Sequence, residues 1–448
     1  MSFLSLARRG LRPAGSLLAA VALSSCTTDV LDITDPDVIN VSDVATTSGV
    51  TAMRNGVLRD FTVVYSGTQD GVIGATGNMA DEIIATDTFF DRLLVNERNT
   101  DPNLGGALNS LYLNLHTARA GATRTIRLWS ELKPTSRDTL SELYSLRGFV
   151  ETFFGEIYCS GVPFSEEDGS TETFGEPQTT ARIFARASAT FDSALTNATG
   201  TANRSLAAVG KGRVLLNQGQ FAQAAAAVAS VPTNFQYQTF HSNATAAQRN
   251  GLWNGLVQPS SRYTVATNEG TNGLPYLKTP NDPRVRWSPS TRLGFDGTTP
   301  NLPTQLKYPE PASPATLANG IEARLIELEA RLQGGTQADR DAVFAGLNTL
   351  RATGLSTAIA PIAAAPTTQA AAVNLLFEER AYWLWLTGHR LSDMRRLIRQ
   401  YGRAANTVFP VGPVATRSGS TYGNDVNFVI PFNETANPNF KGCLDRNA

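Results

Sequence analysis

The chain has 448 residues, of which 42% are apolar and 17% are charged, and its formal net charge is −1. This length suits one large domain with insertions or two to three smaller ones, and the apolar share is enough for a sizeable core. Because the charge is nearly balanced and no basic run follows the first twelve positions, the composition disfavours nucleic-acid binding and attraction to an anionic membrane surface.

The first 25 residues have the pattern of an export signal. Arginines at positions 8, 9 and 12 precede an apolar run, 17–23, that is too short to span a bilayer. The run leads into Leu-Ser-Ser-Cys, which resembles the bacterial lipobox, where the final cysteine receives diacylglycerol and becomes the first residue of the mature chain. Acyl chains on that cysteine suffice for stable anchoring. We therefore predict a lipoprotein signal peptide at 1–25 and lipidation of Cys26.

The residues after Cys26 predict where the lipoprotein resides. Thr27 follows the cysteine, and the absence of an aspartate there favours the outer membrane over the inner membrane, by analogy with other lipoproteins. Residues 27–48 are polar and predict a tether. No later stretch is long and apolar enough to span a membrane, so we expect the mature body to be water-soluble and held by lipid alone. The alternative is an ordinary secretory signal with a chance cysteine.

The sequence has three cysteines, Cys26, Cys159 and Cys443. If Cys26 carries lipid, the other two remain as an even pair. In an oxidising compartment this pair favours a Cys159–Cys443 disulfide, which the loop-entropy relation credits with roughly 5 kcal/mol. Two separate buried thiols are the alternative.

Helical periodicity dominates the first half of the mature chain. Apolar residues in 140–157 recur at spacings of three, four and seven, which predicts a helix that breaks at 159–163. Thr179 and Thr180 are candidate N-caps of the next helix. The segment 207–232 has the small residues and the wedging aromatic of a tetratricopeptide-like helix pair. Because one such pair cannot bury its apolar face, we expect other pairs to stack on it.

The stretch 233–316 is rich in Pro, Gly, Asn, Ser and Thr. Such segments have little regular structure, and long loops on a rigid scaffold often carry function. Aromatic rings can stack on the CH faces of sugars, and carboxylates or amides can bond sugar hydroxyls. The candidate ligand-binding residues are the aromatic residues Trp253, Tyr263, Tyr276 and Trp287 of this stretch, and Asp81, Phe89 and Phe90 of the loop at 78–98. The alternative for each is that it packs its loop onto the core.

Helices resume after residue 317. Alternating apolar and charged residues predict an amphipathic helix there, followed by a short helix at 340–351. The densest helix extends from about Gln369 to Tyr401. Within it, 382–386 is apolar on all sides, which predicts that this part lies inside the protein.

This last helix resembles the C-terminal signature of the SusD/RagB family of outer-membrane nutrient-binding lipoproteins. The signature has a Glu-Arg pair, an acidic residue, Glu-Gly-x-Arg and then Asp-Leu-x-Arg. The residues in matching register are Glu379, Arg380, Gly388, Arg390, Asp393 and Arg396. Trp383 and Thr387 stand where the pattern has acids. Two further blocks, 146–166 and 429–438, are similar to the family's helix before a Gly-x-x-Pro turn and to its closing segment.

The resemblance implies a fold and a role. The fold would be mainly α, with a tetratricopeptide-like helical-repeat scaffold at about 49–232 and 317–402, a loop-rich region at about 233–316 packed on it, and a closing segment at 403–448. The role would be a surface lipoprotein of the outer membrane. Such a protein captures an oligosaccharide or another oligomeric nutrient and passes it to a SusC-like TonB-dependent β-barrel transporter.

The sequence contains no positive sign of catalysis. Its three histidines, His116, His241 and His389, have no metal-ligand spacing with one another, with cysteine or with acids. It contains no Gly-x-Ser-x-Gly elbow and no Walker-type phosphate loop. We therefore expect no catalytic residue, no metal, no cofactor and no nucleic-acid partner. Two alternatives stay open: a helical-repeat lipoprotein that binds other envelope proteins and, less favoured, a lipid-anchored hydrolase.

Overall fold

The computed structural model describes residues 45–168, 171–259, 261–278 and 281–448. The predicted signal peptide at 1–25, Cys26 and most of the predicted tether lie outside these residues. Helices dominate the described chain, and strands occur only as short two-stranded ladders. Among the helices of the described part, none is both long and apolar enough to cross a membrane.

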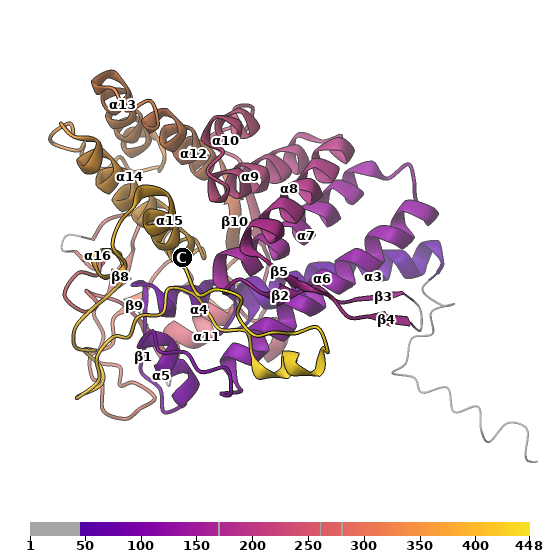
Figure 1. Cartoon of the computed structure of the whole chain (residues 1–448). Coiled ribbons are helices and arrows are strands. Elements are labelled where there is room, and N and C mark those ends of the chain that lie inside the picture. The colour runs from indigo at the N-terminus through magenta and orange to yellow at the C-terminus, as the bar shows by residue number, and fades with distance from the viewer. Residues whose placement is uncertain (1–44, 169–170, 260, 279–280) are drawn as a thin grey trace, which may run out of the picture.

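The scaffold is a row of helices in which each packs against the next, as Figure 1 shows from α3 and α6 to α12 and α13. Its helices, in chain order, are α3 (Thr47–Thr62), α6 (Ala107–Leu132), α7 (Arg137–Ile157), α8 (Thr180–Asn197), α9 (Thr201–Asn217), α10 (Phe221–Val228), α12 (Gly320–Leu332) and α13 (Gln337–Thr353). The strongest contacts join α7 to α8, α9 to α10 and α3 to α6. This stacking of helix pairs is the arrangement that the sequence predicts for 207–232 and its neighbours.

A side-chain cap explains where α8 begins, and a glycine explains how closely α9 and α10 approach each other. Thr179 caps α8, since its hydroxyl accepts a hydrogen bond from the backbone N–H of Arg182 at 3.3 Å, whereas Thr180 is the first helical residue. Gly212 of α9 lies where α9 and α10 cross. A Cβ at this position would be 2.6 Å from Val228 of α10, so only glycine permits this approach.

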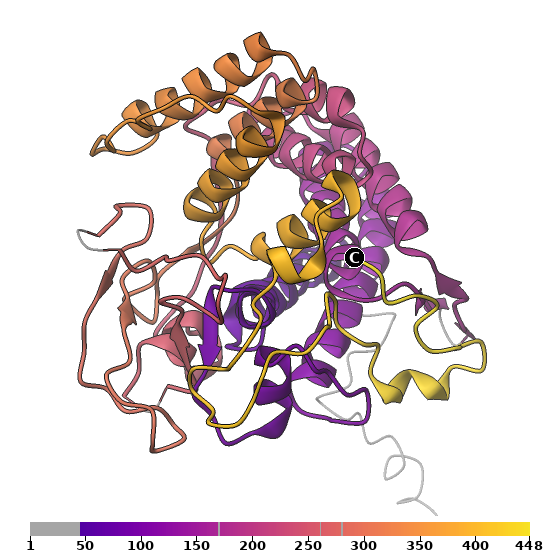
Figure 2. The ribbon, with the colours of Figure 1, turned by 60° about the vertical axis from the view of Figure 1, so that its left-hand side comes forward.

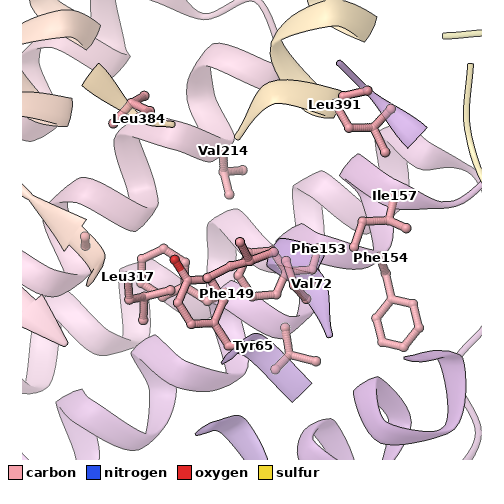
Figure 3. Packing of buried hydrophobic residues seen from close by; sticks show 14 of the residues in the cluster. Tyr65, Val72, Phe149, Phe153, Phe154, Ile157, Val214, Leu317, Leu384 and Leu391 are labelled. Atoms are coloured by element: carbon pink, nitrogen blue, oxygen red, sulfur yellow. The ribbon is translucent and has the colours of Figure 1, made fainter. Parts of the chain in front are cut away.

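The hydrophobic core extends from the scaffold to the elements that cover its inner face. Figure 3 shows Phe149 and Phe153 of α7 close to Tyr65, which belongs to a π-helical turn at Val63–Gly67, and Phe154 further along the same helix. The rings of Tyr65 and Phe153 are stacked, with centroids 5.8 Å apart. Leu384, near the C-terminal signature, is also fully buried in this cluster. A single core therefore joins the N-terminal helices to the C-terminal signature.

The stretch 233–316 contains only short elements, in agreement with its composition. They are β6 (Gln236–Thr239), η2 (Ala246–Gln248), α11 (Gly251–Leu256), β7 (Tyr263–Val265), β8 (Trp287–Ser288) and β9 (Thr304–Gln305), followed by β10 (Ala315–Asn319). The antiparallel ladders pair β6 with β10, β8 with β9, and β7 with β1 (Ile83–Ala85). The β1–β7 ladder joins the loop-rich stretch to the loop at 78–98.

The loop at 78–98 begins at the end of one short helix, α4 (Val72–Met79), and contains a second, α5 (Phe90–Asn96). Because β1 and β7 are antiparallel, the residues after β1 lie beside those before β7. The backbone N–H of Thr86 accordingly donates to the carbonyl of Arg262 at 2.9 Å. Two segments about 175 positions apart in the sequence thus form one edge of the molecule.

The prediction of one continuous helix from Gln369 to Tyr401 is wrong. The structure has two helices, α14 (Gln369–Trp383) and α15 (Arg390–Tyr401). Leu386 and Gly388 lie between them with φ angles of 51° and 73°, which interrupt helical hydrogen bonding. The apolar run 382–386 is buried, as predicted, and after the break α15 packs against α4 and α7.

The closing segment, 403–448, passes across the scaffold and includes α16 (Ala405–Val408) and η3 (Phe432–Ala436). Cys443 forms a disulfide with Cys159, and their Cα atoms are 5.8 Å apart. The turn after α7 also carries two short ladders: β2 (Val162–Pro163) with β5 (Pro177–Gln178), and β3 (Glu166–Asp168) with β4 (Thr171–Thr173). The C-terminal tail is thus joined covalently to the end of α7.

Candidate functional site

The signature residues form a buried ion-pair network rather than a ligand site. Asp393 accepts a hydrogen bond from Arg380 Nε at 2.9 Å and another from Arg396 Nη2 at 2.9 Å. Arg396 also donates to both carboxylate oxygens of Glu329, at 2.6 and 2.9 Å. Burial disfavours the charged form of Asp393, but Arg380 and Arg396 outweigh it and hold the pKa of Asp393 well below its usual range. These ion pairs hold α15 against α12, which carries Glu329, and against α14, which carries Arg380.

Glu379 extends this network to the loop-rich stretch. Its carboxylate accepts hydrogen bonds from Arg284 Nη1 at 2.7 Å and from Arg351 Nε at 3.1 Å. His389 is also buried, and its Nε2 lies 2.9 Å from both Arg213 Nη1 and Glu322 Oε1. Each of these groups has protein partners, so their role is structural.

Asp81 is a predicted ligand-binding residue that the structure places in the core. It is fully buried, and its two carboxylate oxygens accept hydrogen bonds from Arg390 Nε at 2.7 Å and Nη2 at 2.8 Å. The backbone N–H of Leu274 also donates to it at 3.0 Å. The interpretation of Asp81 as a ligand contact is therefore wrong, because both of its carboxylate oxygens already accept hydrogen bonds from the protein.

Tyr263 and Tyr276 are also buried, so the ligand-binding role predicted for them is wrong. Tyr263 lies in β7 and its hydroxyl donates to Asp70 at 2.6 Å. Tyr276 packs against Tyr382 with ring centroids 5.5 Å apart. Both rings attach their loops to the core, which is the alternative stated for every aromatic residue of this stretch.

Trp253 and Trp287 are half-buried. Trp253, in α11, has the guanidinium of Arg249 over its ring at 5.8 Å. Trp287, in β8, donates its indole N–H to the carbonyl of Lys278 at 3.4 Å. The structure does not bring these two tryptophans together with the exposed phenylalanines of the 78–98 loop.

Phe89 and Phe90 are exposed, with 51% and 52% of their surface accessible. The structure adds two residues that the sequence analysis did not identify. The guanidinium of Arg262 lies between two phenyl rings, 4.4 Å from the centroid of Phe89 and 3.8 Å from that of Phe295. Phe295 is itself 39% exposed. We call Phe89, Phe90, Arg262 and Phe295 the aromatic platform.

Asp87 holds the platform arginine in place. Its buried carboxylate accepts hydrogen bonds from Arg262 Nη1 at 2.6 Å and from Arg92 Nη1 at 2.8 Å. Arg92 in turn donates to Asp70 at 2.8 Å. Two aspartates therefore face two arginines, so the charge of Arg262 is balanced within the protein.

Phe295 is presented by a turn. The carboxylate of Asp296 accepts hydrogen bonds from the backbone N–H groups of Thr298 and Thr299, at 2.9 and 3.0 Å. The backbone N–H of Asp296 donates to the carbonyl of Thr86 at 2.9 Å, which fastens the turn to the end of β1. The sequence analysis missed Phe295 because an exposed phenylalanine and a core phenylalanine look alike in sequence. The turn-forming Asp-Gly that follows it is the only local signal.

A groove of about 710 Å³ lies on the scaffold between α3, α7 and the segment that begins with β6. Phe240, which is 75% exposed, lines it together with Tyr237 and His241. His241 Nε2 lies 2.9 Å from the hydroxyl of Ser66, and burial lowers the pKa of His241. We call this concavity the scaffold groove.

A second concavity, of about 470 Å³, lies where the loop-rich stretch meets the scaffold. Figure 2 shows the two parts facing each other, with the loops in salmon and the helices in orange. Trp383 and Thr387, the two positions where the C-terminal signature has acids, both line it. We call this concavity the interface cavity. Among the described residues, no group of three His, Cys, Asp or Glu side chains is arranged to hold a metal ion.

Solved structures share this architecture. A SusD superfamily protein from Bacteroides fragilis superposes with a TM-score of 0.66 over 88% of this chain and 99% of its own length, at 14% identity. A laminarin-binding SusD-like protein superposes with a TM-score of 0.63 over 89% and 99% of the two chains, at 15% identity. A putative sugar-binding protein from Bacteroides vulgatus gives 0.61 over 90% and 99%, at 15% identity.

The comparisons establish the fold. No protein-family profile and no curated protein sequence matches the chain. The chain nevertheless has the mainly α, tetratricopeptide-like fold of SusD superfamily proteins over most of its length, as the C-terminal signature predicted.

Proposed function

We propose that this protein is a SusD-like lipoprotein that binds a neutral oligosaccharide on its aromatic platform and delivers it to a TonB-dependent transporter. The observation that carries the proposal is the Arg262 guanidinium held between Phe89 and Phe295 while both rings stay accessible. The arginine fixes the rings at little entropic cost, so their accessible surfaces are ready to contact a ligand.

The chemistry of the platform favours a sugar. Phenyl rings match the CH faces of pyranosides, and Arg262 is already paired with Asp87, so the platform has no unpaired cation at its centre that would require an anionic ligand. Two proteins with the same fold, a laminarin-binding SusD-like protein and a putative sugar-binding protein, support the same ligand class. A shallow, exposed site implies modest affinity, which suits a protein that must release its ligand to a transporter.

The platform is tested by replacing Phe89 and Phe295 with alanine together. Removing both rings takes away the stacking surface, so we expect affinity for laminarin-derived oligosaccharides, or for another neutral glycan first identified on an array, to fall at least about tenfold. Isothermal titration calorimetry measures the loss. Phe240→Ala is the matched control, because Phe240 is also an exposed phenylalanine but lies in the scaffold groove.

The two variants separate the candidate surfaces. Unchanged binding in the platform variant together with lost binding in Phe240→Ala would move the ligand to the scaffold groove. Binding to peptides with no glycan bound by the unmodified protein would refute the sugar part of the proposal. Since both sets of side chains are at the surface, neither variant should lower the unfolding midpoint appreciably.

The membrane anchor is proposed from sequence alone, because Cys26 lies outside the described residues. Replacing Cys26 with serine removes the thiol that would accept diacylglycerol. We expect the unmodified protein in the outer-membrane fraction, with a mature N-terminal peptide heavier by its acyl chains in mass spectrometry, and the Cys26→Ser protein outside that fraction. Thr28→Ser is the control, since it changes a hydroxyl residue close to the lipobox and leaves both Cys26 and the Cys159–Cys443 disulfide intact. An unmodified peptide from the native protein would contradict the anchor.

A further inference from the structure

The geometry points to a second ligand site: the interface cavity accepts the acidic group of a carboxylated or sulfated sugar, held between Arg286 and Lys307. This inference concerns a different surface and a different ligand class from the aromatic platform. Several polar groups that line the interface cavity have no hydrogen-bond partner among the described residues and can therefore bind a ligand.

The walls of the cavity come from several segments that are distant in the sequence. Arg286 directly precedes β8 and Lys307 follows its partner strand β9, and the backbone N–H of Leu306 donates to the carbonyl of Arg286 at 2.8 Å. Trp383, at the end of α14, forms another wall. Gln236 of β6 lies on the third side. A volume of about 470 Å³ is within the usual range for small-ligand sites.

The charge of the cavity is one-sided. Among its described lining residues are three cations and no aspartate or glutamate. Arg284 is neutralised by Asp282 and Glu379, at 2.7 Å from each. The guanidinium of Arg286, by contrast, has no hydrogen bond or ion pair with any described residue. The cavity therefore keeps an uncompensated positive charge, which favours an anion.

Lys307 is the second uncompensated cation. Its ammonium donates to the carbonyl of Trp385 and has no ion-pair partner among the described residues. Burial lowers the pKa of Lys307 to about 8, and the nearby carboxyl of Glu82 opposes this only in part. Burial in turn raises the pKa of Glu82 to about 8, so that at neutral pH it is mostly uncharged. Lys307 therefore supplies the cavity lining with a cation that no carboxylate neutralises at neutral pH.

The remaining lining groups suit a sugar. The amides of Asn234 and Gln236 have no hydrogen-bond partner within the described chain and can bond hydroxyls. Trp383 presents an aromatic wall, and its buried indole N–H lacks an acceptor among the described residues. Phe235 and Leu355 complete an apolar side. A sugar ring can therefore be contacted while its acidic group meets the two cations.

The test uses four probes and calorimetry on the full mature protein. The probes are digalacturonate, its uncharged counterpart galactobiose, galactose 6-sulfate and inorganic sulfate. We expect digalacturonate or galactose 6-sulfate to bind at least about tenfold more tightly than galactobiose and inorganic sulfate. Preference between the two acidic sugars identifies the acidic group. Equal binding of galactobiose, or binding of inorganic sulfate as tight as that of the better sugar, would overturn the inference.

Two variants locate the binding. Arg286→Gln alters an exposed side chain and Lys307→Met removes a buried amine without leaving a charge unpaired, so both should fold. Each is expected to weaken binding of the acidic sugar at least about tenfold. The Phe89→Ala, Phe295→Ala double variant, which alters only the platform, should bind that sugar as the unmodified protein does. Acidic-sugar binding that survives in both cavity variants would refute the site.

A pH series adds a readout that a merely structural role would not produce. As the pH rises from 7 to 9, Lys307 loses its proton and Glu82 gains charge, and both changes disfavour an anion. Affinity of the unmodified protein should therefore fall by roughly tenfold over this interval, because only the fraction with a charged Lys307 binds well. The remaining affinity of Lys307→Met should change much less. Identical pH profiles for the two proteins would contradict the role of Lys307.

Discussion

Replacing Asp81 with asparagine is expected to lower the free energy of unfolding by about 3–5 kcal/mol. The change barely alters shape, but it leaves the Arg390 guanidinium charged in the core. The pKa of Arg390 lies above its usual range: burial opposes the charge, but the nearby Asp81 outweighs burial, so the guanidinium stays charged in the core. Denaturant titration followed by circular dichroism measures the loss.

An exposed ion pair is the matched control. Arg59 donates to Asp60 at 2.7 Å, and the arginine is 73% exposed. Solvent screens this pair, so Asp60→Asn should cost less than about 1 kcal/mol. Similar losses in the two variants would mean that the Asp81–Arg390 pair contributes no more than a surface pair, and would contradict the assignment of Asp81 as a core structural residue.

Removing the Cys159–Cys443 disulfide is the second large change. Replacing both cysteines with serine should lower the free energy of unfolding by up to about 5 kcal/mol, because the bridge closes a very long loop and so restricts the unfolded chain. The two positions are 284 residues apart. The native fold should survive, since the tail near Cys443 also bonds the turn after α7 through the backbone of Ser160.

A reductant provides the control for this prediction. Dithiothreitol should lower the unfolding midpoint of the unmodified protein to that of the double serine variant and leave the variant unchanged. Free-thiol titration should detect thiols at positions 159 and 443 only after reduction. Two reactive thiols in the oxidised, unfolded protein would refute the bridge.

The candidate ligand-binding residues fall into two groups, those that the structure buries and those that it leaves exposed, and the sequence alone does not separate the groups. Tyr263, Tyr276 and Asp81 have the side chains that a sugar site needs, but the structure uses their hydroxyls and carboxylate inside the protein. Phe89 and Phe90 are exposed on the loop where the sequence placed them. Composition identifies which loops carry aromatic residues, but it does not identify which rings face solvent, because packing against distant segments decides that.

The sequence by itself determined the helices, the Thr179 cap, the loop-rich character of 233–316 and the C-terminal signature. Each of these depends on local spacing, on the preferences of single residues or on short motifs. Only the tertiary structure decided the break between α14 and α15, the partners of the buried charges, the aromatic platform and the interface cavity. Arg262 of the platform, for example, is bound by Asp87, which lies 175 positions away in the sequence. Contacts of that range depend on how the whole chain packs, and no local pattern encodes them.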